Sequence, residues 1–462
     1  AYNFTSKPGF SKVGSYTGNG TSQSISTGFE VGFVLIKSTT SSQGWMMYDS
    51  TRGGNKYLEA NSAAAEGTTT SNLVNFYSNG FGVKNSNSEN QSGQTFIYLA
   101  IAADGSTATP SLANSFATEI YTGNGGTKSI TGTGFKPGFS WVKNRNTAGN
   151  NNNLADIVRG VNNIVVTNST GAQYFNSTYQ FNSFDTDGIT VTDDAAGNYG
   201  FNGNNETYVA WNWKAGGTPS INTDGAITSL VSANQAAGFS VITYNGATNA
   251  TADASNNGGA YWSVAHGLGA APDLVFVKKT NGAGGWYVGG AALGSTGANG
   301  NHLVLNSSAA QVGEANILWG GSQTFNATTF GLGGWDVVNR NGDSYVAYCF
   351  TSISSYSKAG SYTGNGSSTG PIVTTGFEPA FVLIKATTTD NGGGNWIIYD
   401  NARSTSNPRN KRLYPDLNIA EQSNSAYDLD FLSTGFQPKN GTSYYGFNTN
   451  NVEYIYLAIK EN

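Results

Sequence analysis

The 462-residue sequence contains a single cysteine, Cys349, so no intrachain disulfide can form and packing must hold the fold together. Cys349 lies in a strand-like run at residues 345–350, which predicts a buried small side chain and not a reactive thiol. No apolar stretch approaches the roughly 18 residues that a membrane span needs, and no basic leader precedes an apolar segment. We therefore expect no membrane insertion and no signal peptide in a chain made in the cytoplasm.

Charge is also scarce, since charged residues make up only 11% of the chain and the 23 basic residues form no long run. Nucleic acid is not an expected partner, because a phosphate-tracking surface needs clustered positive charge. The two histidines, His266 and His302, lack the His-x-x-x-His spacing of a zinc site. Convergent titratable groups are few, so we expect no enzyme activity, no metal site and no cofactor.

One acidic segment, residues 185–188, superficially resembles a calcium-binding loop. Its Asp-Thr-Asp-Gly sequence lacks the distal Glu and the twelve-residue spacing of an EF-hand loop. An Asp-Gly pair between two strand-like runs is instead typical of a tight hairpin turn. The sequence therefore predicts a hairpin here.

Glycine and aromatic residues are abundant, with 62 Gly, 25 Tyr, 24 Phe and nine Trp. The aromatic residues supply material for a core and argue against disorder. Short runs of β-branched and aromatic residues alternate with Asn-Gly, Asp-Gly and other Gly-rich turns, whereas no window of 12 or more residues has a helical period. This pattern predicts an all-β fold of sandwich or barrel type with little helix.

The sequence repeats itself. Tyr-Thr-Gly-Asn-Gly occurs at residues 16–20, 121–125 and 362–366, and a shorter Tyr-Asn-Gly occurs at residues 244–246. Each leads into a strand-like apolar run, and each repeat closes on an aromatic strand. We therefore expect four tandem β-sandwich domains, jelly-roll or concanavalin-like, at residues 1–115, 116–217, 218–355 and 356–462, the third being the most divergent.

A polar motif, Asp-x-x-Arg, follows three of the strand-like runs, at Asp49, Asp156 and Asp400. Two of these runs also carry a tryptophan, so the candidate carbohydrate contacts are Trp45, Asp49, Arg52, Trp396, Asp400 and Arg403. An indole face and a charged pair could stack on and hydrogen-bond a sugar. The alternative is an ion pair that closes a turn, which would stabilise the fold by about 0–1 kcal/mol if exposed. The carboxylate pair of a retaining glycosidase is not evident in any repeat.

The motifs together resemble a repeated domain of structural proteins from marine tailed bacteriophages. The residues that carry the resemblance are Tyr-Thr-Gly-Asn-Gly, Gly-Phe-x-Pro-x-Phe-Val-x-Ile-Lys, Trp-x-x-Tyr-Asp-x-x-Arg, Ser-Asn-Gly-Phe and the final Tyr-Ile-Tyr-Leu-Ala-Ile-Lys-Glu-Asn. The resemblance covers essentially the whole chain. It implies a β-sandwich protein on the virion exterior, as a tail fibre, appendage or capsid decoration, and it implies no catalytic residue.

The expected partners of such a protein are other virion proteins, further copies of itself and host surface glycans. Two other functions stay open at the level of sequence. One is a glycan-degrading tailspike, which would need clustered carboxylates in a groove. The other is a bacterial adhesin or filament subunit.

Overall fold

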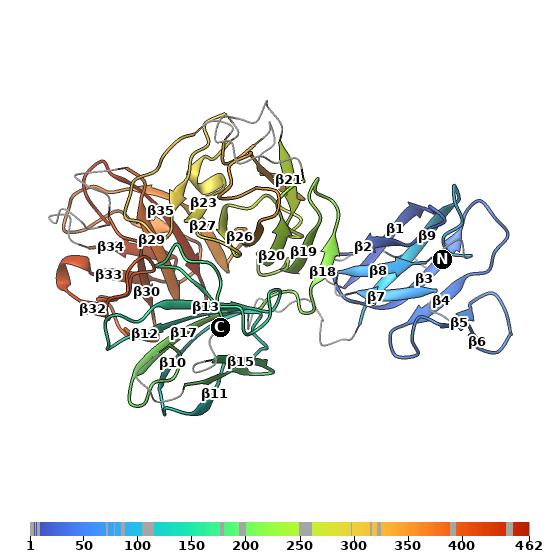
Figure 1. The fold of residues 1–462 in the computed structure, drawn as a ribbon, viewed down its shortest axis with the longest axis horizontal. Helices are drawn as coiled ribbons and strands as arrows, with labels where there is room; N and C mark the ends of the chain where they lie inside the picture. The colour runs from blue at the N-terminus through green and yellow to red at the C-terminus, as the bar shows by residue number, and fades with distance from the viewer. Residues whose placement is uncertain are drawn as a thin grey trace. The chain divides into compact units, whose positions relative to one another are not determined.

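The structure is a computed structural model, and it describes residues 4, 6, 10–70, 73–77, 79–84, 88–103, 115–175, 180–193, 200–248, 261–296, 298–314, 317–320, 325–388, 394–439 and 447–461. The chain forms two compact units, which are described separately. The first comprises residues 1–111 and 218–220, and the second comprises residues 112–217 and 221–462. Antiparallel sheets dominate both, and the described residues contain no α-helix (Figure 1). The prediction of an all-β fold is confirmed.

The first unit contains a six-stranded sheet, here called the first large sheet, and a three-stranded small sheet. In spatial order, the large sheet consists of β1 (Ser11–Thr17), β9 (Thr95–Ala102), β3 (Val31–Ser38), β4 (Met46–Asp49), β5 (Lys56–Glu59) and β6 (Gly67–Thr68). The small sheet consists of β2 (Gln23–Ser26), β8 (Gly80–Val83) and β7 (Val74–Tyr77).

The second unit begins with the second large sheet, β10 (Phe116–Thr122), β17 (Thr207–Trp213), β12 (Phe139–Asn144), β13 (Asn152–Asp156) and β14 (Val165–Val166). Its small sheet is β11 (Thr127–Thr131), β16 (Gly188–Thr192) and β15 (Gln180–Asp185). Strands β15 and β16 pair directly across the Asp-Gly turn, with Asp185 opposite Gly188. The expected hairpin at this acidic segment is therefore confirmed.

The third large sheet is β18 (Ser220–Asn222), β19 (Ser229–Asn234), β20 (Phe239–Asn245), β26 (Ser344–Phe350), β22 (Leu274–Lys279), β23 (Trp286–Gly289) and β24 (Leu303–Val304). A two-stranded sheet, β21 (Trp262–Ala265) and β25 (Thr329–Leu332), accompanies it, and a 3₁₀ turn, η3 (Ala291–Leu293), follows β23.

The fourth large sheet is β27 (Ser357–Thr363), β35 (Glu453–Ile459), β29 (Phe381–Ala386) and β30 (Ile397–Asp400). Its small sheet is β28 (Val373–Thr374), β34 (Gly435–Pro438) and β33 (Leu429–Leu432). A further pair, β31 (Lys411–Arg412) and β32 (Gln422–Ser423), and a 3₁₀ turn, η4 (Ser425–Tyr427), complete the part of the chain that the structure describes.

Each large sheet has two apolar faces, because side chains alternate along a strand. One face, here called the inner face, joins a core with residues of the accompanying small sheet, as Val34 and Ile36 do with Val74 and Phe81. The opposite, outer faces of the second, third and fourth large sheets pack together into one further cluster, here called the common core. Cys349 is fully buried on the inner side of β26, as expected, and burial raises the pKa of its thiol above the ordinary value.

The Tyr-Thr-Gly-Asn-Gly motif is held by a buried asparagine far along the chain. In the fourth sheet, the Tyr362 hydroxyl donates to the carbonyl of Phe447 at 2.7 Å, and the Asn448 Oδ1 accepts from the Asn365 backbone N–H at 2.9 Å. The same pair of contacts recurs where Asn90 and Asn202 face the other two motifs. The motif thus fixes the loop that leaves each first strand.

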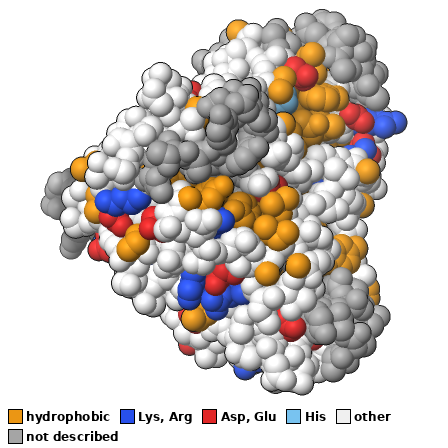
Figure 2. All heavy atoms as spheres, turned by 90° about the vertical axis from the view of Figure 1, so that its left-hand side faces the viewer, with side chains coloured by type: hydrophobic (Ala, Val, Ile, Leu, Met, Phe, Trp, Pro, Cys, Tyr) orange, Lys and Arg blue, Asp and Glu red, His pale blue; other side chains and the backbone are white. Residues whose placement is uncertain are grey.

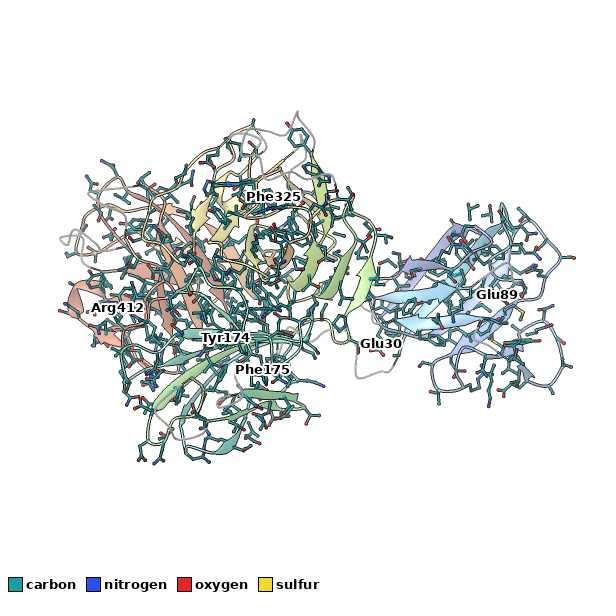
Figure 3. The ribbon with its side chains drawn as sticks, in the orientation of Figure 1. Glu30, Glu89, Tyr174, Phe175, Phe325 and Arg412 are labelled. Atoms are coloured by element: carbon teal, nitrogen blue, oxygen red, sulfur yellow. The ribbon has the colours of Figure 1, made fainter. Side chains whose placement is uncertain are left out.

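The first unit adds a buried carboxylate to this arrangement. Glu89, labelled in Figure 3, lies among the strands of the first unit, where its side chain accepts a hydrogen bond from the Tyr48 hydroxyl at 2.6 Å. Its backbone carbonyl accepts from the Tyr16 hydroxyl, also at 2.6 Å. Burial, together with the neighbouring Glu89 charge, raises the pKa of both tyrosines. Both phenols therefore remain protonated donors that order the end of the first large sheet.

Candidate functional site

The Asp-x-x-Arg motif has one geometry at all three positions. The aspartate ends a large-sheet strand, its Oδ1 accepts the arginine backbone N–H, and its Oδ2 accepts the arginine Nε. The backbone contacts are each 2.8 Å long, and the pairs are Asp49 with Arg52, Asp156 with Arg159 and Asp400 with Arg403. The motif is therefore a turn that the side chain of its own aspartate closes. In the third sheet the turn is replaced by η3, whose Leu293 enters the common core.

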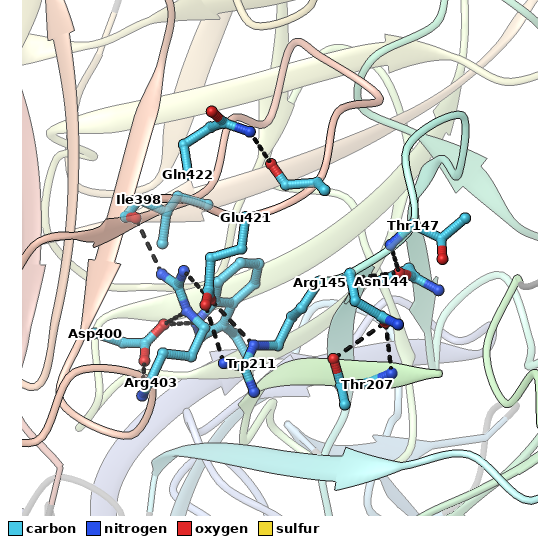
Figure 4. Close-up of polar contacts among 12 residues, drawn as sticks. Asn144, Arg145, Thr147, Thr207, Trp211, Ile398, Asp400, Arg403, Glu421 and Gln422 are labelled. Atoms are coloured by element: carbon cyan, nitrogen blue, oxygen red, sulfur yellow. Dashed lines mark hydrogen bonds and ion pairs between the residues drawn. The ribbon is translucent and has the colours of Figure 1, made fainter. Parts of the chain in front are cut away.

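The Asp400–Arg403 pair is completely buried between the second and fourth large sheets (Figure 4). The indole Nε1 of Trp211, on β17, donates to Asp400 Oδ2 at 2.9 Å. The guanidinium carbon of Arg403 lies 5.6 Å from the centre of the Trp211 ring, in cation–π range. This side of the motif therefore contacts another sheet and not solvent.

Glu421 joins the same cluster to Arg145, in the loop that follows β12. It accepts from Arg403 Nη1 at 3.1 Å and from Arg145 through both of its oxygens, each at 3.0 Å. Burial raises the pKa of Glu421, but the hydrogen bonds and charges of the two arginines outweigh burial and lower the pKa below its ordinary value. The carboxylate is therefore charged and bridges two arginines from different sheets.

The Asp156–Arg159 pair makes an equivalent junction with the third sheet. The Tyr348 hydroxyl, on β26, donates to Asp156 Oδ2 at 2.8 Å, and Arg159 Nη2 donates to the same hydroxyl at 3.2 Å. Burial raises the pKa of the Tyr348 hydroxyl above its ordinary value. Tyr348 on β26 and Trp211 on β17 occupy corresponding places in the register of their sheets, so the two junctions have the same geometry.

The tryptophans of β23 and the fourth sheet make a second kind of contact between sheets. Trp286 Nε1 donates to the Val166 carbonyl at 2.8 Å, and Trp396 Nε1 donates to the Val304 carbonyl at 3.0 Å. At the corresponding place in the second sheet, Asn152 Nδ2 donates to three carbonyls of the fourth, those of Tyr414, Pro415 and Leu417. Each large sheet of the second unit thus donates hydrogen bonds to one neighbouring sheet and accepts hydrogen bonds from the other.

The remaining motif, in the first unit, lies at the surface. Trp45 is 38% exposed, and the side chains of Asp49 and Arg52 are partly exposed. Arg52 also pairs with Glu66, at 3.1 Å. Partial burial raises the pKa of Asp49, but hydrogen bonds and the charge from Arg52 outweigh it and lower the pKa. Here the ion pair is accessible and charged.

The six predicted carbohydrate contacts therefore divide into two groups. Trp396, Asp400 and Arg403 are 1%, 0% and 2% exposed, so they offer no surface on which a sugar could lie. Trp45, Asp49 and Arg52 are accessible, and a sugar contact there stays a prediction. Trp211, Tyr348 and Glu421, which complete the buried clusters, were not predicted from the sequence. No sequence spacing links them to the motif, since their partners are up to 192 residues away.

The two histidines are used in packing. His266 is buried, with its Nδ1 accepting from the Leu268 backbone N–H at 3.1 Å and its Nε2 lying 3.0 Å from the Asn326 carbonyl. His302 is also buried and contacts Tyr287 and Trp335. In the described ranges, no three His, Cys, Asp or Glu side chains are grouped closely enough to hold a metal ion.

One open groove lies in the second unit, with a volume of about 380 Å³. Its walls are mostly uncharged polar residues of β20 and nearby segments, among them Thr228, Thr243, Asn245, Thr280 and Ser344. Ile221 supplies an exposed apolar wall. Figure 2 shows another face of the molecule, on which Lys, Arg, Asp and Glu side chains form small separate groups among uncharged atoms. Arg159 also lines the groove, but its charge is paired with Asp156, so the groove could hold a neutral hydroxylated ligand.

The fold and its buried junctions define an all-β protein of packed antiparallel sheets. The chain belongs to the family of the domain of unknown function DUF7483, whose model matches residues 1–104 and 111–462. No curated protein matches the chain. Within the ranges described above, no helix has the length and apolar character needed to span a bilayer.

Proposed function

We propose that this chain is a non-enzymatic structural protein of the virion surface of a tailed marine bacteriophage. It would serve as a tail fibre, appendage or capsid decoration and bind other virion proteins. The sequence motifs that resemble such proteins motivate the proposal. The observation that carries it is that the acidic, basic and hydroxyl groups of the two buried Asp-x-x-Arg clusters in the second unit are occupied in holding sheets together, as Asp156, Arg159 and Tyr348 are.

The proposal includes four diverged copies of one β-sandwich, of jelly-roll or concanavalin type. A recurring strand order supports it, because β9, β17, β26 and β35 each lie between the strand that carries the motif tyrosine (β1, β10, β20 or β27) and an apolar strand (β3, β12, β22 or β29). The buried asparagine that holds the loop after the first strand recurs as well, at Asn90, Asn202, Asn339 and Asn448. A rigid, repeated scaffold of this kind presents its loops at fixed spacing without an ordering cost.

Host glycan adsorption is a second component of the proposal, and the groove beside β20 supports it. Hydroxyl and amide side chains such as Thr243 and Asn245 can exchange hydrogen bonds with sugar hydroxyls, and Ile221 can pack against an apolar sugar face. Affinity at one groove would be weak. Several chains on one particle would bind with useful avidity.

Immunogold labelling of intact particles tests the virion assignment. We expect an antibody against the purified chain to label the particle exterior, and pre-absorption of the antibody with the chain to abolish the label. Label confined to lysed-cell debris would contradict the proposal. Label on the surface of uninfected bacteria would favour the adhesin or filament alternative.

A depolymerisation assay tests the tailspike alternative. The purified chain is incubated with host envelope polysaccharide, and the reducing ends are counted over time. We expect no more reducing ends than in the heat-denatured control, because no groove with clustered carboxylates is evident in the described residues. Sustained release of fragments would overturn the non-enzymatic assignment.

A further inference from the structure

The outer face of the first large sheet is apolar but open. Leu35, Trp45, Met47, Ile97, Leu99 and Ile101 lie on this face, and none of them is buried. Trp45 and Ile97 are each 38% exposed. A contiguous apolar patch of this kind marks an interaction site more often than a free surface. The face therefore requires a partner, and the second unit indicates which one.

The same positions are buried in the three other large sheets. Leu35 pairs with Leu99 across β3 and β9, and the corresponding pairs are Trp141 with Trp211, Phe276 with Tyr348, and Leu383 with Leu457. The last three pairs lie in the common core, where every member is buried. The first sheet thus presents at its surface the positions that the other three use for packing.

The common core is formed by three such faces packed against one another. Each of the three combinations of sheets is in direct contact. The distances between ring centres show this. They are 4.7 Å for Phe139 and Tyr348, between the second and third sheets, and 6.2 Å for Phe276 and Trp396, between the third and fourth. The centres of Trp213 and Phe381, between the second and fourth, are 5.5 Å apart. Three faces therefore fill one core among themselves.

The polar contacts around this core run in one direction. One lysine on the apolar strand of each sheet donates a hydrogen bond to a backbone carbonyl of a neighbouring sheet. The lysine of the fourth sheet donates to a carbonyl after β24 of the third, that of the third to a carbonyl after β14 of the second, and that of the second to a carbonyl after β31, beside the fourth. The pairs are Lys385 with Ser308, Lys278 with Thr170, and Lys143 with Leu417. The tryptophan and asparagine contacts described above follow the same order. Head-to-tail contacts that return to the start form a closed ring of three.

We propose that three copies of this chain associate through the outer faces of their first large sheets, in the arrangement that the other three sheets adopt within one chain. The first sheet has the groups for the same ring. Trp45, directly before β4, corresponds to Trp286, the first residue of β23 in the third sheet. The strand register likewise places Glu59 of the first sheet at the position that Val304 has in the third. The Trp45 indole of one chain therefore donates to the Glu59 carbonyl of the next.

This inference is independent of the virion assignment, since it rests on the sheet faces alone. Sedimentation equilibrium of the full chain tests it. We expect the mass of three chains across the micromolar range. Leu99→Asp, at the centre of the face, and Ile97→Lys, at a half-exposed position that folding tolerates, are each expected to reduce the mass to one chain. Ser24→Asp, on the exposed side of the small sheet, is the matched control and keeps three.

Circular dichroism of each variant verifies that it is folded before its mass is interpreted, and Ile97→Lys keeps the test valid if Leu99→Asp does not fold. A native mass of one or two chains would overturn the proposal. So would a three-chain mass that both folded face variants retain, because the contact would then lie elsewhere. Loss of the three-chain mass in Ser24→Asp would also count against it.

Discussion

The indole Nε1 of Trp211 lies 2.9 Å from Oδ2 of Asp400, although 189 residues separate the two along the chain. Trp211 lies on β17, an interior strand of the second large sheet, and Asp400 ends β30, an edge strand of the fourth. Both side chains are buried. Their hydrogen bond ties a carboxylate that already holds Arg403 to a second sheet, so the motif connects sheets as well as closing a turn.

The first prediction compares two copies of the motif. Asp400→Ala should lower the free energy of unfolding by about 3–5 kcal/mol, because it leaves the Arg403 charge buried with one fewer carboxylate. Asp49→Ala, in the partly exposed copy, should lower it by only about 0–1 kcal/mol. Urea denaturation measures both. Equal losses would show that burial does not set the strength of the pair.

The second prediction isolates the indole hydrogen bond. Trp211→Phe and Trp141→Phe both replace an indole by a smaller phenyl ring on the outer face of the second large sheet. Within the described residues, however, the Trp141 indole nitrogen has no hydrogen-bond partner, whereas that of Trp211 donates to Asp400. Trp211→Phe should therefore cost about 1.5–3 kcal/mol more than Trp141→Phe, the range for a bond to a charged group. Thermal denaturation of the two variants under one set of conditions gives the difference. A difference near zero would contradict the assigned bond.

The third prediction concerns the buried asparagine that holds the loop after β27. Asn448→Ala should destabilise the fold by about 2–4 kcal/mol, since it leaves the Asn365 backbone N–H and the Ser367 carbonyl without this partner. Asn450→Ala, at an exposed position two residues on, is the matched control and should change stability by about 0.5 kcal/mol or less. Chemical denaturation measures both, and similar losses would refute the role of Asn448.

The fourth prediction is a pH dependence. Burial lowers the pKa of Lys143 to about 7, and its amine donates to the carbonyls of Asn150 and Leu417. The unfolded chain, with an ordinary lysine pKa, binds more protons at this position above about pH 7, so this lysine makes stability rise with pH. The rise is expected below about pH 8.5, because the buried tyrosines and Cys349, whose pKa burial raises, oppose it at higher pH. Buried Lys278 and Lys385, with pKa lowered to about 8, add to the rise.

Urea denaturation between about pH 7.5 and 8.5 measures this slope. Lys143→Met should reduce it, because the variant has no proton to lose at this position, whereas Lys136→Met, at an exposed position, serves as the control. A slope that falls with pH in the native protein, or that Lys143→Met leaves unchanged, would contradict the buried, readily deprotonated amine.

Local features of this fold were predictable because their causes are local. Alternating apolar residues and Asn-Gly or Asp-Gly turns predicted the all-β fold and the hairpin at Asp185, since period-two burial and positive-φ turns are read directly from neighbouring residues. The burial of Cys349 followed from its place in an aromatic strand.

The candidate site was not predictable to the same extent, because its environment depends on a third layer of packing. Asp49 and Asp400 have the same local sequence pattern, yet one is partly exposed and the other is completely buried. What distinguishes them is whether another sheet covers the outer face. Tyr348 and Trp211 cover the motif from strands that are distant in the sequence, so no sequence spacing predicts these contacts.

Native-state hydrogen exchange in β17, β26 and β35 tests most directly the claim that three sheets share one core, on which the structural role and the three-chain association both depend. Because the outer faces of the three sheets pack together, we expect amides in these three strands to share one highest opening free energy, and Trp211→Phe to lower it equally in all three. Three separate opening free energies, with the variant affecting β17 alone, would contradict the common core.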